Sequence, residues 1–350
     1  MALLPDPPAS RPPSRLSLHT GVLLAAIVIG LPAMVGVRPF IGPSARPLTD
    51  RKFEATPERL ARGKYLMTSG RPPCIMCHSP LEATPDGGLA IPAGKEFSGR
   101  SFAVEGAPFV VAPNLTPDPE TGIGTWTDDQ IARAVREGIS HDGRALFPIM
   151  PYEKFRAMSD EDLAAVVVYL RSLPPVRHEQ AKTAVPFPLN RLINNAPEPV
   201  TAPVSPDLST PEKRGAYIAE MGVCTDCHTP RDDKGNVRTD MAFAGGTAMP
   251  FGNRKVVYSA NITPGVNGIP YYSEDLFIET IRTGKVRSRH LDAMMPWQVY
   301  RNMTDQDLKD LFAYLKTLKP VDHYVDNALP PTFCAKCGLT HGGGERNKKG

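Results

Sequence analysis

The strongest constraint on the fold is a set of sequence landmarks that occurs twice, in the same order, in the two halves of the chain. The pentapeptide Cys-x-x-Cys-His begins at Cys74 and again at Cys224. Each copy follows a Thr-Pro-Glu run and precedes Asn-Leu/Ile-Thr-Pro, then Met-Pro-aromatic, then a leucine 13 residues after that methionine. Self-similarity of this kind indicates repeated structural units. The chain therefore consists of two copies of one domain.

Both copies are expected to be mostly helical. Thr56 and Thr210 are suited to cap a first helix, because a proline follows each at the first helical position. Ser159 and Thr304 are suited to cap a last helix, because acidic residues occupy the turn after each of them. Apolar residues then recur at helical spacing on one face. The fold class predicted is all-α.

The N-terminal segment has the length and composition of a membrane span. Residues 16–37 contain no Asp, Glu, Lys or Arg. A helix of this length reaches roughly 33 Å, and the hydrocarbon core is about 30 Å thick. A cleaved signal peptide is the alternative, but its apolar region is usually shorter and no convincing A-x-A site follows. We therefore expect a transmembrane signal anchor with membrane lipid as its partner.

The repeat and the anchor together predict the organisation of the whole chain. Prolines are concentrated before the second copy, which indicates a semi-rigid linker. Glycine and lysine dominate the C-terminus, which indicates a flexible tail. The predicted parts are a cytoplasmic N-terminus (1–15), the transmembrane anchor (16–37), the first domain (51–180), the Pro-rich linker (181–207), the second domain (208–325) and the tail (326–350).

The duplicated pentapeptide predicts covalent haem attachment. Two thiols three positions apart suit the two vinyl groups of one haem, and the next residue can place its imidazole on the iron. Cys74 and Cys77 would hold the first haem, with His78 as an iron ligand. In the second copy the corresponding residues are Cys224, Cys227 and His228. Two haem c groups are therefore the predicted cofactors.

A sixth iron ligand must come from an equivalent place in both copies. Met150 and Met295 qualify, and a methionine opposite histidine raises the haem potential. Each lies directly before a proline, where the backbone is restricted. Met158 and Met303 also correspond, but they lie where a hydrophobic staple would pack against the last helix. Met294 breaks the alignment of the repeat. We therefore predict that Met150 and Met295 are the axial ligands.

Other polar residues near these motifs allow more than one interpretation. Asn114 and Asn261, each with a threonine two residues later, could hydrogen-bond haem propionates, brace the methionine loop or cap turns. Trp126 is expected to pack rather than to bind a propionate. His141 and His290 do not correspond in the two copies and are expected at the surface.

A further cysteine pair lies near the C-terminus. Cys334 and Cys337 are followed by Gly338 rather than histidine, so we count no third haem. A degenerate haem motif, a disulfide, or half of a zinc site with His341 are all open at this point.

The order of these motifs resembles class I cytochrome c domains. More narrowly, it is similar to the cytochrome c subunits of membrane-bound alcohol and gluconate dehydrogenases, over about residues 55–325. The resemblance implies the cytochrome c fold, in which the first and last helices cross, and it implies Met150 and Met295 as axial ligands. This chain has two haem motifs, whereas the alcohol dehydrogenase cytochromes have three.

The expected function is electron transfer by two His/Met-ligated haems, from a dehydrogenase or quinol to other redox proteins of the respiratory chain. The resemblance implies that haems of this type are attached on the outer side of the bacterial inner membrane, so we expect both domains in the periplasm, anchored to that membrane. The net charge of +3 gives no reason to expect nucleic acid as a partner. We expect no catalytic residues. A di-haem peroxidase and a gas sensor are the alternatives, and both need an iron with an open position, which two methionine ligands would not leave.

Overall fold

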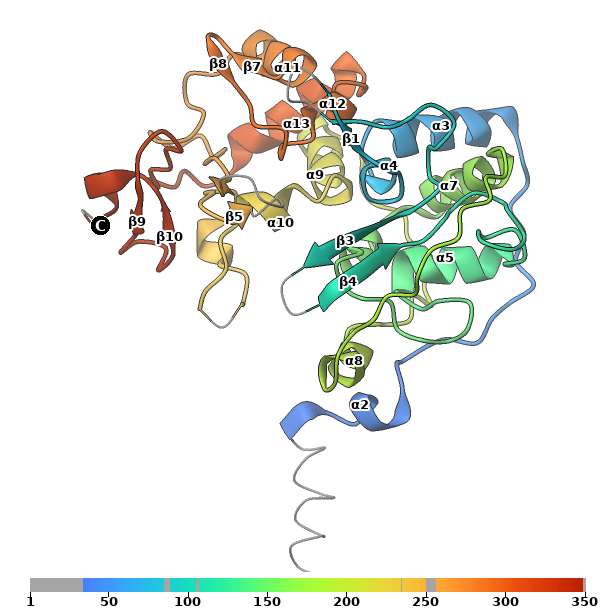
Figure 1. Ribbon diagram of the computed structural model, residues 1–350. Helices are drawn as coiled ribbons and strands as arrows, with labels where there is room; N and C mark the ends of the chain where they lie inside the picture. Colours follow the sequence, from blue (N-terminus) through green and yellow to red (C-terminus); the bar gives the residue numbers. More distant parts are fainter. Residues whose placement is uncertain (1–33, 85–88, 105–106, 234, 250–255, 349–350) are drawn as a thin grey trace, which may run out of the picture.

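The computed structural model describes residues 34–84, 89–104, 107–233, 235–249 and 256–348. Two helical units lie side by side, and the C-terminal hairpin lies at the far end of the second unit (Figure 1). Each unit has a hydrophobic core, and Tyr217, Met221 and Val299 of the second unit also pack into the core of the first. Leu163 lies in the core of the first unit, and Leu308 in the core of the second.

The first domain is built around two crossing helices. The chain forms α3 (Pro57–Thr68), α4 (Cys74–Cys77), α5 (Asp128–Glu137), α6 (Tyr152–Phe155) and α7 (Asp160–Ser172). Gly63 of α3 lies where α3 meets α7. A Cβ atom at this glycine would lie 2.0 Å from the backbone oxygen of Ala165 in α7. The two helix backbones therefore approach one another more closely than any side chain permits.

The second domain repeats this arrangement. It contains α9 (Pro211–Met221), α10 (Cys224–His228), η2 (Thr239–Met241), α11 (Glu274–Thr283), α12 (Trp297–Tyr300) and α13 (Asp305–Thr317). Gly215 of α9 corresponds to Gly63. A Cβ atom on Gly215 would lie 1.9 Å from the backbone oxygen of Asp310 in α13. The first and last helices thus cross in both copies, as the resemblance implied.

The predicted helix caps are confirmed. The side chains of Thr56 and Thr210 accept hydrogen bonds from the third N–H of α3 and α9. Ser159 and Thr304 do the same for α7 and α13. Each cap satisfies one backbone donor that the helix itself leaves unpaired.

The prediction of an all-α fold is correct for the crossing helices but incomplete, because short hairpins join them. Each strand pairs only with its hairpin neighbour. The paired strands are β1 (Glu82–Ala83) with β2 (Leu89–Ala90), β3 (Arg100–Val104) with β4 (Ala107–Ala112), β5 (Ala248–Met249) with β6 (Val257–Tyr258), and β7 (Lys285–Val286) with β8 (Arg289–His290). Apart from β3 and β4, these strands have only two residues each, too few for a period-of-two pattern to stand out in the sequence.

The two domains contact each other through equivalent tyrosines. Tyr217 in the first helix of domain 2 donates a hydrogen bond of 2.8 Å to Asp162 in the last helix of domain 1. Tyr65 in the first helix of domain 1 accepts from the Thr304 N–H at 2.8 Å and donates to Asp307 in domain 2. The contact is reciprocal, so each domain uses the same side chain to bind the other.

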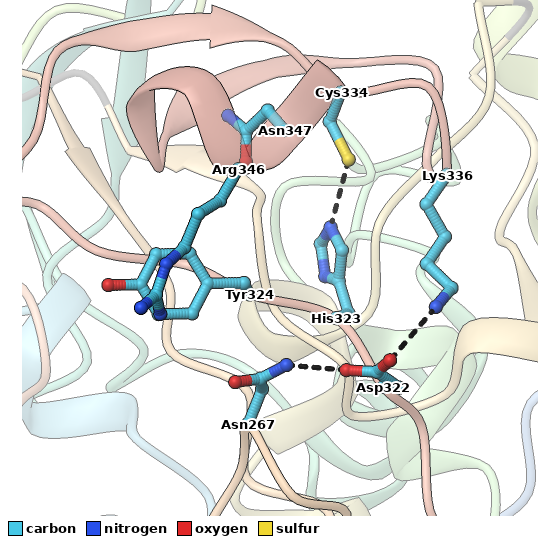
Figure 2. A pocket seen from close by; sticks show the side chains of 8 residues that line it. All are labelled: Asn267, Asp322, His323, Tyr324, Cys334, Lys336, Arg346 and Asn347. Atoms are coloured by element: carbon cyan, nitrogen blue, oxygen red, sulfur yellow. Dashed lines mark hydrogen bonds and ion pairs between the residues drawn. The ribbon is translucent and has the colours of Figure 1, made fainter. Parts of the chain in front are cut away.

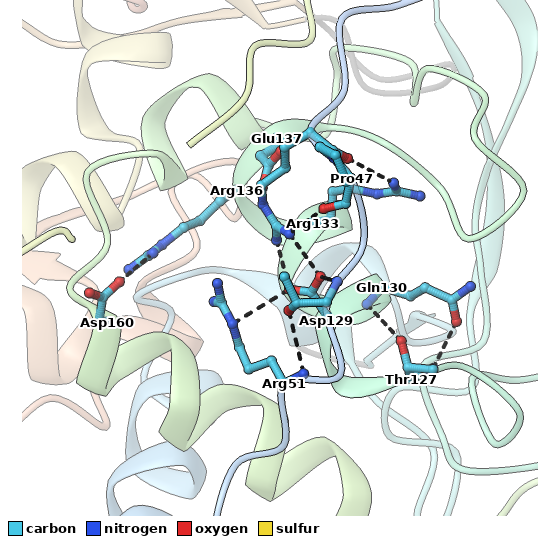
Figure 3. A network of polar contacts seen from close by, with 11 residues as sticks. Pro47, Arg51, Thr127, Asp129, Gln130, Arg133, Arg136, Glu137 and Asp160 are labelled. Carbon is cyan, nitrogen blue, oxygen red and sulfur yellow. Dashed lines mark hydrogen bonds and ion pairs between the residues drawn. The ribbon is translucent and has the colours of Figure 1, made fainter. Parts of the chain in front are cut away.

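A buried ion-pair network fixes the segment that precedes the first domain (Figure 3). The Arg46 guanidinium lies 2.7 Å from a carboxylate oxygen of Asp129 and 2.8 Å from a carboxylate oxygen of Glu137. Both acidic residues are on α5. The Thr49 N–H also donates to Asp129. Burial opposes ionisation of Asp129, but Arg46 and Thr49 together hold its pKa below its ordinary value. The segment thus docks on α5.

The predicted linker packs against the N-terminal segment. It forms α8 (Leu189–Leu192) and η1 (Ile193–Asn195), which lie beside α2 (Arg38–Ile41) (Figure 1). The Asn195 side chain donates to the Val35 carbonyl at 3.0 Å. Most of the predicted anchor, residues 16–33, lies outside the described residues. Within the described part of the chain, no helix is long and apolar enough to cross a membrane.

The expectation of a flexible tail is wrong for the described residues up to 348. They form β9 (Pro331–Phe333), β10 (Thr340–Gly342) and η3 (Gly344–Lys348). The Asn327 side chain accepts a hydrogen bond of 2.8 Å from the Tyr258 N–H of the second domain. Cys334 and Cys337 are buried in a small cluster with Met241. The glycine content of this segment predicted disorder, and the contacts that order it are not visible in the sequence.

Candidate haem sites

The two pentapeptides lie in equivalent short helices, α4 and α10, each directly after the first helix of its domain. Cys74 and Cys77 are not joined in a disulfide, and neither are Cys224 and Cys227. Their thiols are thus available for thioether bonds. One helical turn separates the two cysteines of each pair, which brings both thiols to the same side.

Both motif histidines are held in the form that binds iron. Nδ1 of His78 lies 2.7 Å from the Pro113 carbonyl oxygen, and Nδ1 of His228 lies 2.8 Å from the Ala260 carbonyl oxygen. A carbonyl only accepts, so each Nδ1 carries the proton and each Nε2 keeps a lone pair. Burial lowers the pKa of His78 to about 4 and also lowers that of His228, so both rings are neutral at pH 7. This donor set fits haem iron.

The Asn-x-Thr segments hold those carbonyls in place. The Asn114 side chain accepts from the Thr116 N–H at 2.9 Å and donates to the Val176 carbonyl at 2.7 Å. Asn261 accepts from Thr263 at 2.9 Å and donates to Val321 at 2.9 Å. The residue before each asparagine supplies the carbonyl that contacts the motif histidine. The turn-capping interpretation therefore holds, and its consequence is the orientation of His78 and His228.

A second pair of equivalent residues escaped the sequence analysis. Phe97 and Phe243 both have φ of 60°, an uncommon conformation for a bulky residue. Two residues after each, a glycine N–H donates to the carbonyl of the motif histidine, at 2.6 Å for His78 and 2.7 Å for His228. The signal was present as Phe-x-Gly in both copies. The number of residues between Phe-x-Gly and the following Asn-x-Thr segment differs between the two copies, and this difference concealed the match.

The predicted axial methionines occupy equivalent turns. Met150 is partly buried against the core of domain 1, which Cys74 also contacts. Met295 is partly buried against the core of domain 2, which Cys224 also contacts. Each methionine carbonyl accepts from the N–H two residues later, at 2.8 Å and 2.7 Å. The structure thus brings each methionine and its attachment motif to one core, and their ligand role stays a prediction.

The competing methionines have structural positions. Met158 and Met303 are only 1% and 4% exposed and lie within the same clusters as Leu163 and Leu308, as a hydrophobic staple requires. His141 is exposed and stacks on Trp126, with ring centroids 4.5 Å apart.

Tyr300 links the two sites and was not predicted. Its hydroxyl donates to the Gly222 carbonyl just before the second motif, at 2.9 Å. A Cβ atom on Gly70, just before the first motif, would lie 2.5 Å from the Tyr300 ring. Burial raises the pKa of Tyr300 well above its ordinary value, so the hydroxyl stays protonated. One buried side chain therefore contacts the backbone beside both haem motifs.

Comparison with known proteins agrees with this geometry. The sequence profile of the Cytochrome c family matches residues 60–174 and 212–319, which is more than half of the chain. The chain belongs to the cytochrome c family, whose members carry electrons. Covalently attached haem c is its cofactor, as predicted, with one attachment motif in each matched segment.

Three relatives cover most of this chain. It is 32% identical over 69% of its length to a subunit of the nicotinate dehydrogenase of Pseudomonas putida, and 30% identical over 75% to the cytochrome c subunit of the quinone alcohol dehydrogenase of Gluconobacter oxydans. It is 28% identical over 75% to a diheme cytochrome c-type protein of Cereibacter sphaeroides. The chain spans 20%, 55% and 86% of these relatives, respectively.

Proposed function

We propose that this chain is a di-haem electron carrier that accepts electrons from a membrane-bound dehydrogenase and passes them to the respiratory chain. The single observation that carries the proposal is the duplicated histidine geometry, with His78 and His228 both held by a backbone carbonyl. The relatives named as dehydrogenase subunits support the choice of donor. A quinol donor fits the same sites.

When bound, each haem supplies one-electron redox chemistry at its iron. The residues of the chain itself set the reduction potential of each haem and the path of the electrons. The Nδ1–H contacts raise the basicity of each imidazole. Met150 and Met295, as sixth ligands, would close the remaining position on each iron. Tyr300 fills space beside both motifs, because its hydroxyl binds the Gly222 carbonyl and its ring packs on Gly70.

We further propose that residues 16–37 anchor the protein in the bacterial inner membrane, with both domains in the periplasm. The apolar composition of this segment and the periplasmic site of covalent haem attachment support this orientation. The docked segment around Arg46 would then hold domain 1 close to the membrane.

Purification of the full chain from its native membranes in mild detergent tests the proposal. A co-purifying dehydrogenase subunit, together with haem reduction by that enzyme's substrate, is the expected result. Release of the chain when the membranes are washed, and its purification without any redox partner, would contradict the proposal.

A di-haem peroxidase is the alternative activity, and the relatives named above give it no support. Mixing the fully reduced protein with peroxide separates the two functions. Slow oxidation of the haems fits an electron carrier, whereas rapid reduction of peroxide, sustained over many turnovers when an excess of electron donor is added, would establish the peroxidase.

A further inference from the structure

A second group of potential metal ligands, separate from the residues of both haem motifs, lies where the C-terminal hairpin packs against the second domain. Four side chains point their ligand atoms at one another, and all four atoms lie within 4.8 Å of each other. All four residues are buried. We call this group the Cys2His2 cluster; its members are His323, Cys334, Cys337 and His341.

The spacing inside the cluster matches tetrahedral zinc. With Zn–S bonds of about 2.3 Å and Zn–N bonds of about 2.0–2.1 Å, a tetrahedral site has S···N separations of about 3.5 Å and N···N separations of about 3.3 Å. Sγ of Cys334 lies 3.6 Å from Nε2 of His323. Nε2 of His323 lies 2.9 Å from Nε2 of His341. For these two pairs of atoms, a shift of a few tenths of an ångström reaches the tetrahedral separations.

Both imidazoles are fixed in the form that binds a metal through Nε2. Nδ1 of His323 lies 2.8 Å from the Ala244 carbonyl oxygen, and Nδ1 of His341 lies 2.9 Å from the Gly342 carbonyl oxygen. Each Nδ1 therefore donates, and two Nε2 lone pairs face each other. Two acceptors at this distance repel unless a cation lies between them. A zinc ion removes the repulsion, and the carbonyls act as its outer shell of partners.

The surrounding backbone is shaped for this cluster. Gly246 has φ of 91°, and a Cβ atom there would lie 2.8 Å from the His323 ring and 3.2 Å from the His341 ring. Gly338, with φ of 76°, follows the second cysteine and lets the chain turn back into β10. Lys336, between the two cysteines, pairs with Asp322 beside His323 (Figure 2). Residues of both the C-terminal hairpin and the second domain therefore surround the Cys2His2 cluster.

The sequence spacing agrees with the geometry. Cys334-x2-Cys337 has the cysteine spacing of structural zinc sites, His341 follows in β10, and His323 comes from the segment after α13. A pocket lined by His323 and Cys334 reaches the cluster and gives a metal access to it (Figure 2). Neither cysteine is in a disulfide, and histidine does not follow the second one, so the cluster does not fit a haem.

We propose that the Cys2His2 cluster binds one structural Zn²⁺, which ties the C-terminal hairpin to the second domain. Binding converts two thiols to thiolates and releases two protons. The ion has no redox role and no open coordination position. The site uses none of the residues assigned to the haems, and the proposal does not rest on the proposed electron donor.

The decisive experiment is elemental analysis of the full-length holoprotein, purified without a histidine tag. One zinc for every two haem irons is expected. X-ray absorption at the zinc edge should show two sulfur and two nitrogen ligands at about 2.3 and 2.0–2.1 Å. Absence of zinc together with a Cys334–Cys337 disulfide in the mass spectrum would overturn the proposal. Copper or iron in the cluster would overturn it equally.

Variants give a second readout. Cys337→Ser should lower bound zinc at least tenfold, while haem content stays at two per chain and reports that both domains fold. His290→Ala, at an exposed histidine of the same domain, is the matched control and should leave zinc unchanged. Zinc removal by a chelator should speed proteolysis within residues 325–348 at least tenfold. Unchanged zinc content in Cys337→Ser would refute the assignment.

Discussion

The close crossing of α3 and α7 leads to a quantitative prediction. The substitution Gly63→Ala should destabilise domain 1, although alanine has the higher helix propensity. The new Cβ atom would lie 2.0 Å from the Ala165 oxygen, whereas ordinary contacts begin at 3.4 Å. The helices must therefore separate by about 1.4 Å, and overpacking of this kind costs up to about 3 kcal/mol. Alanine returns about 1 kcal/mol of propensity. The net loss in free energy of unfolding should be about 2 kcal/mol.

Urea unfolding followed by tryptophan emission measures this loss. The chain has two tryptophans, Trp126 in domain 1 and Trp297 in domain 2. In a Trp297→Tyr background, emission reports domain 1 alone, because its covalent haem quenches Trp126 until the domain unfolds. Ala61→Gly, at an exposed position of the same helix, is the control and should cost about 1 kcal/mol from propensity. Gly63→Ala and Ala61→Gly, although opposite in kind, should thus both lower the free energy of unfolding. A Gly63→Ala variant that gains about 1 kcal/mol would refute the close crossing.

Three other predictions follow from the contacts described above. Tyr217→Phe removes the buried hydrogen bond to Asp162 and should cost about 1–3 kcal/mol, seen in calorimetry as separation of the two domain transitions; an unaltered thermogram would count against the reciprocal contact. Because the pKa of Asp129 is held low, its contribution to stability is present above about pH 3.9 and is lost as pH falls further. Proteolysis within residues 34–50 should therefore rise below that pH, and in Arg46→Ala it should already be fast at pH 7. Asn261→Ala should loosen the carbonyl that orients His228 and shift the potential of one haem only, measured by redox titration.

Much of the domain architecture followed from the sequence. Capping residues act over three or four positions, so Ser159 and Thr304 could be identified locally, and the structure confirms them. The attachment motifs are equally local. Met158 and Met303 lie buried in the cores, as the staple pattern predicted.

What the sequence did not reveal depends on contacts between distant segments. Gly63 is critical only because α7 packs on it, and nothing near Gly63 in the sequence indicates this. Tyr300 acquires its role from the backbone of both domains. The C-terminal segment was expected to be flexible from its glycine and lysine content, whereas its contacts, such as that of Asn327 with Tyr258, are made with residues far away in the sequence. Long-range partners of this kind are invisible to motif spacing.

The measurement that tests the central claim most directly is a spectroelectrochemical titration of the unaltered protein and its methionine variants. Two one-electron steps are expected, with no carbon monoxide binding to the reduced protein. Met150→Ala and Met295→Ala should each lower one of the two potentials, on the order of 0.1 V within the roughly 0.8 V that axial ligands span, and each should admit carbon monoxide to one haem. Met294→Ala is the matched control and should change neither step. Carbon monoxide binding by the unaltered protein, or potentials unmoved by both variants, would contradict an electron carrier with two His/Met-ligated haems.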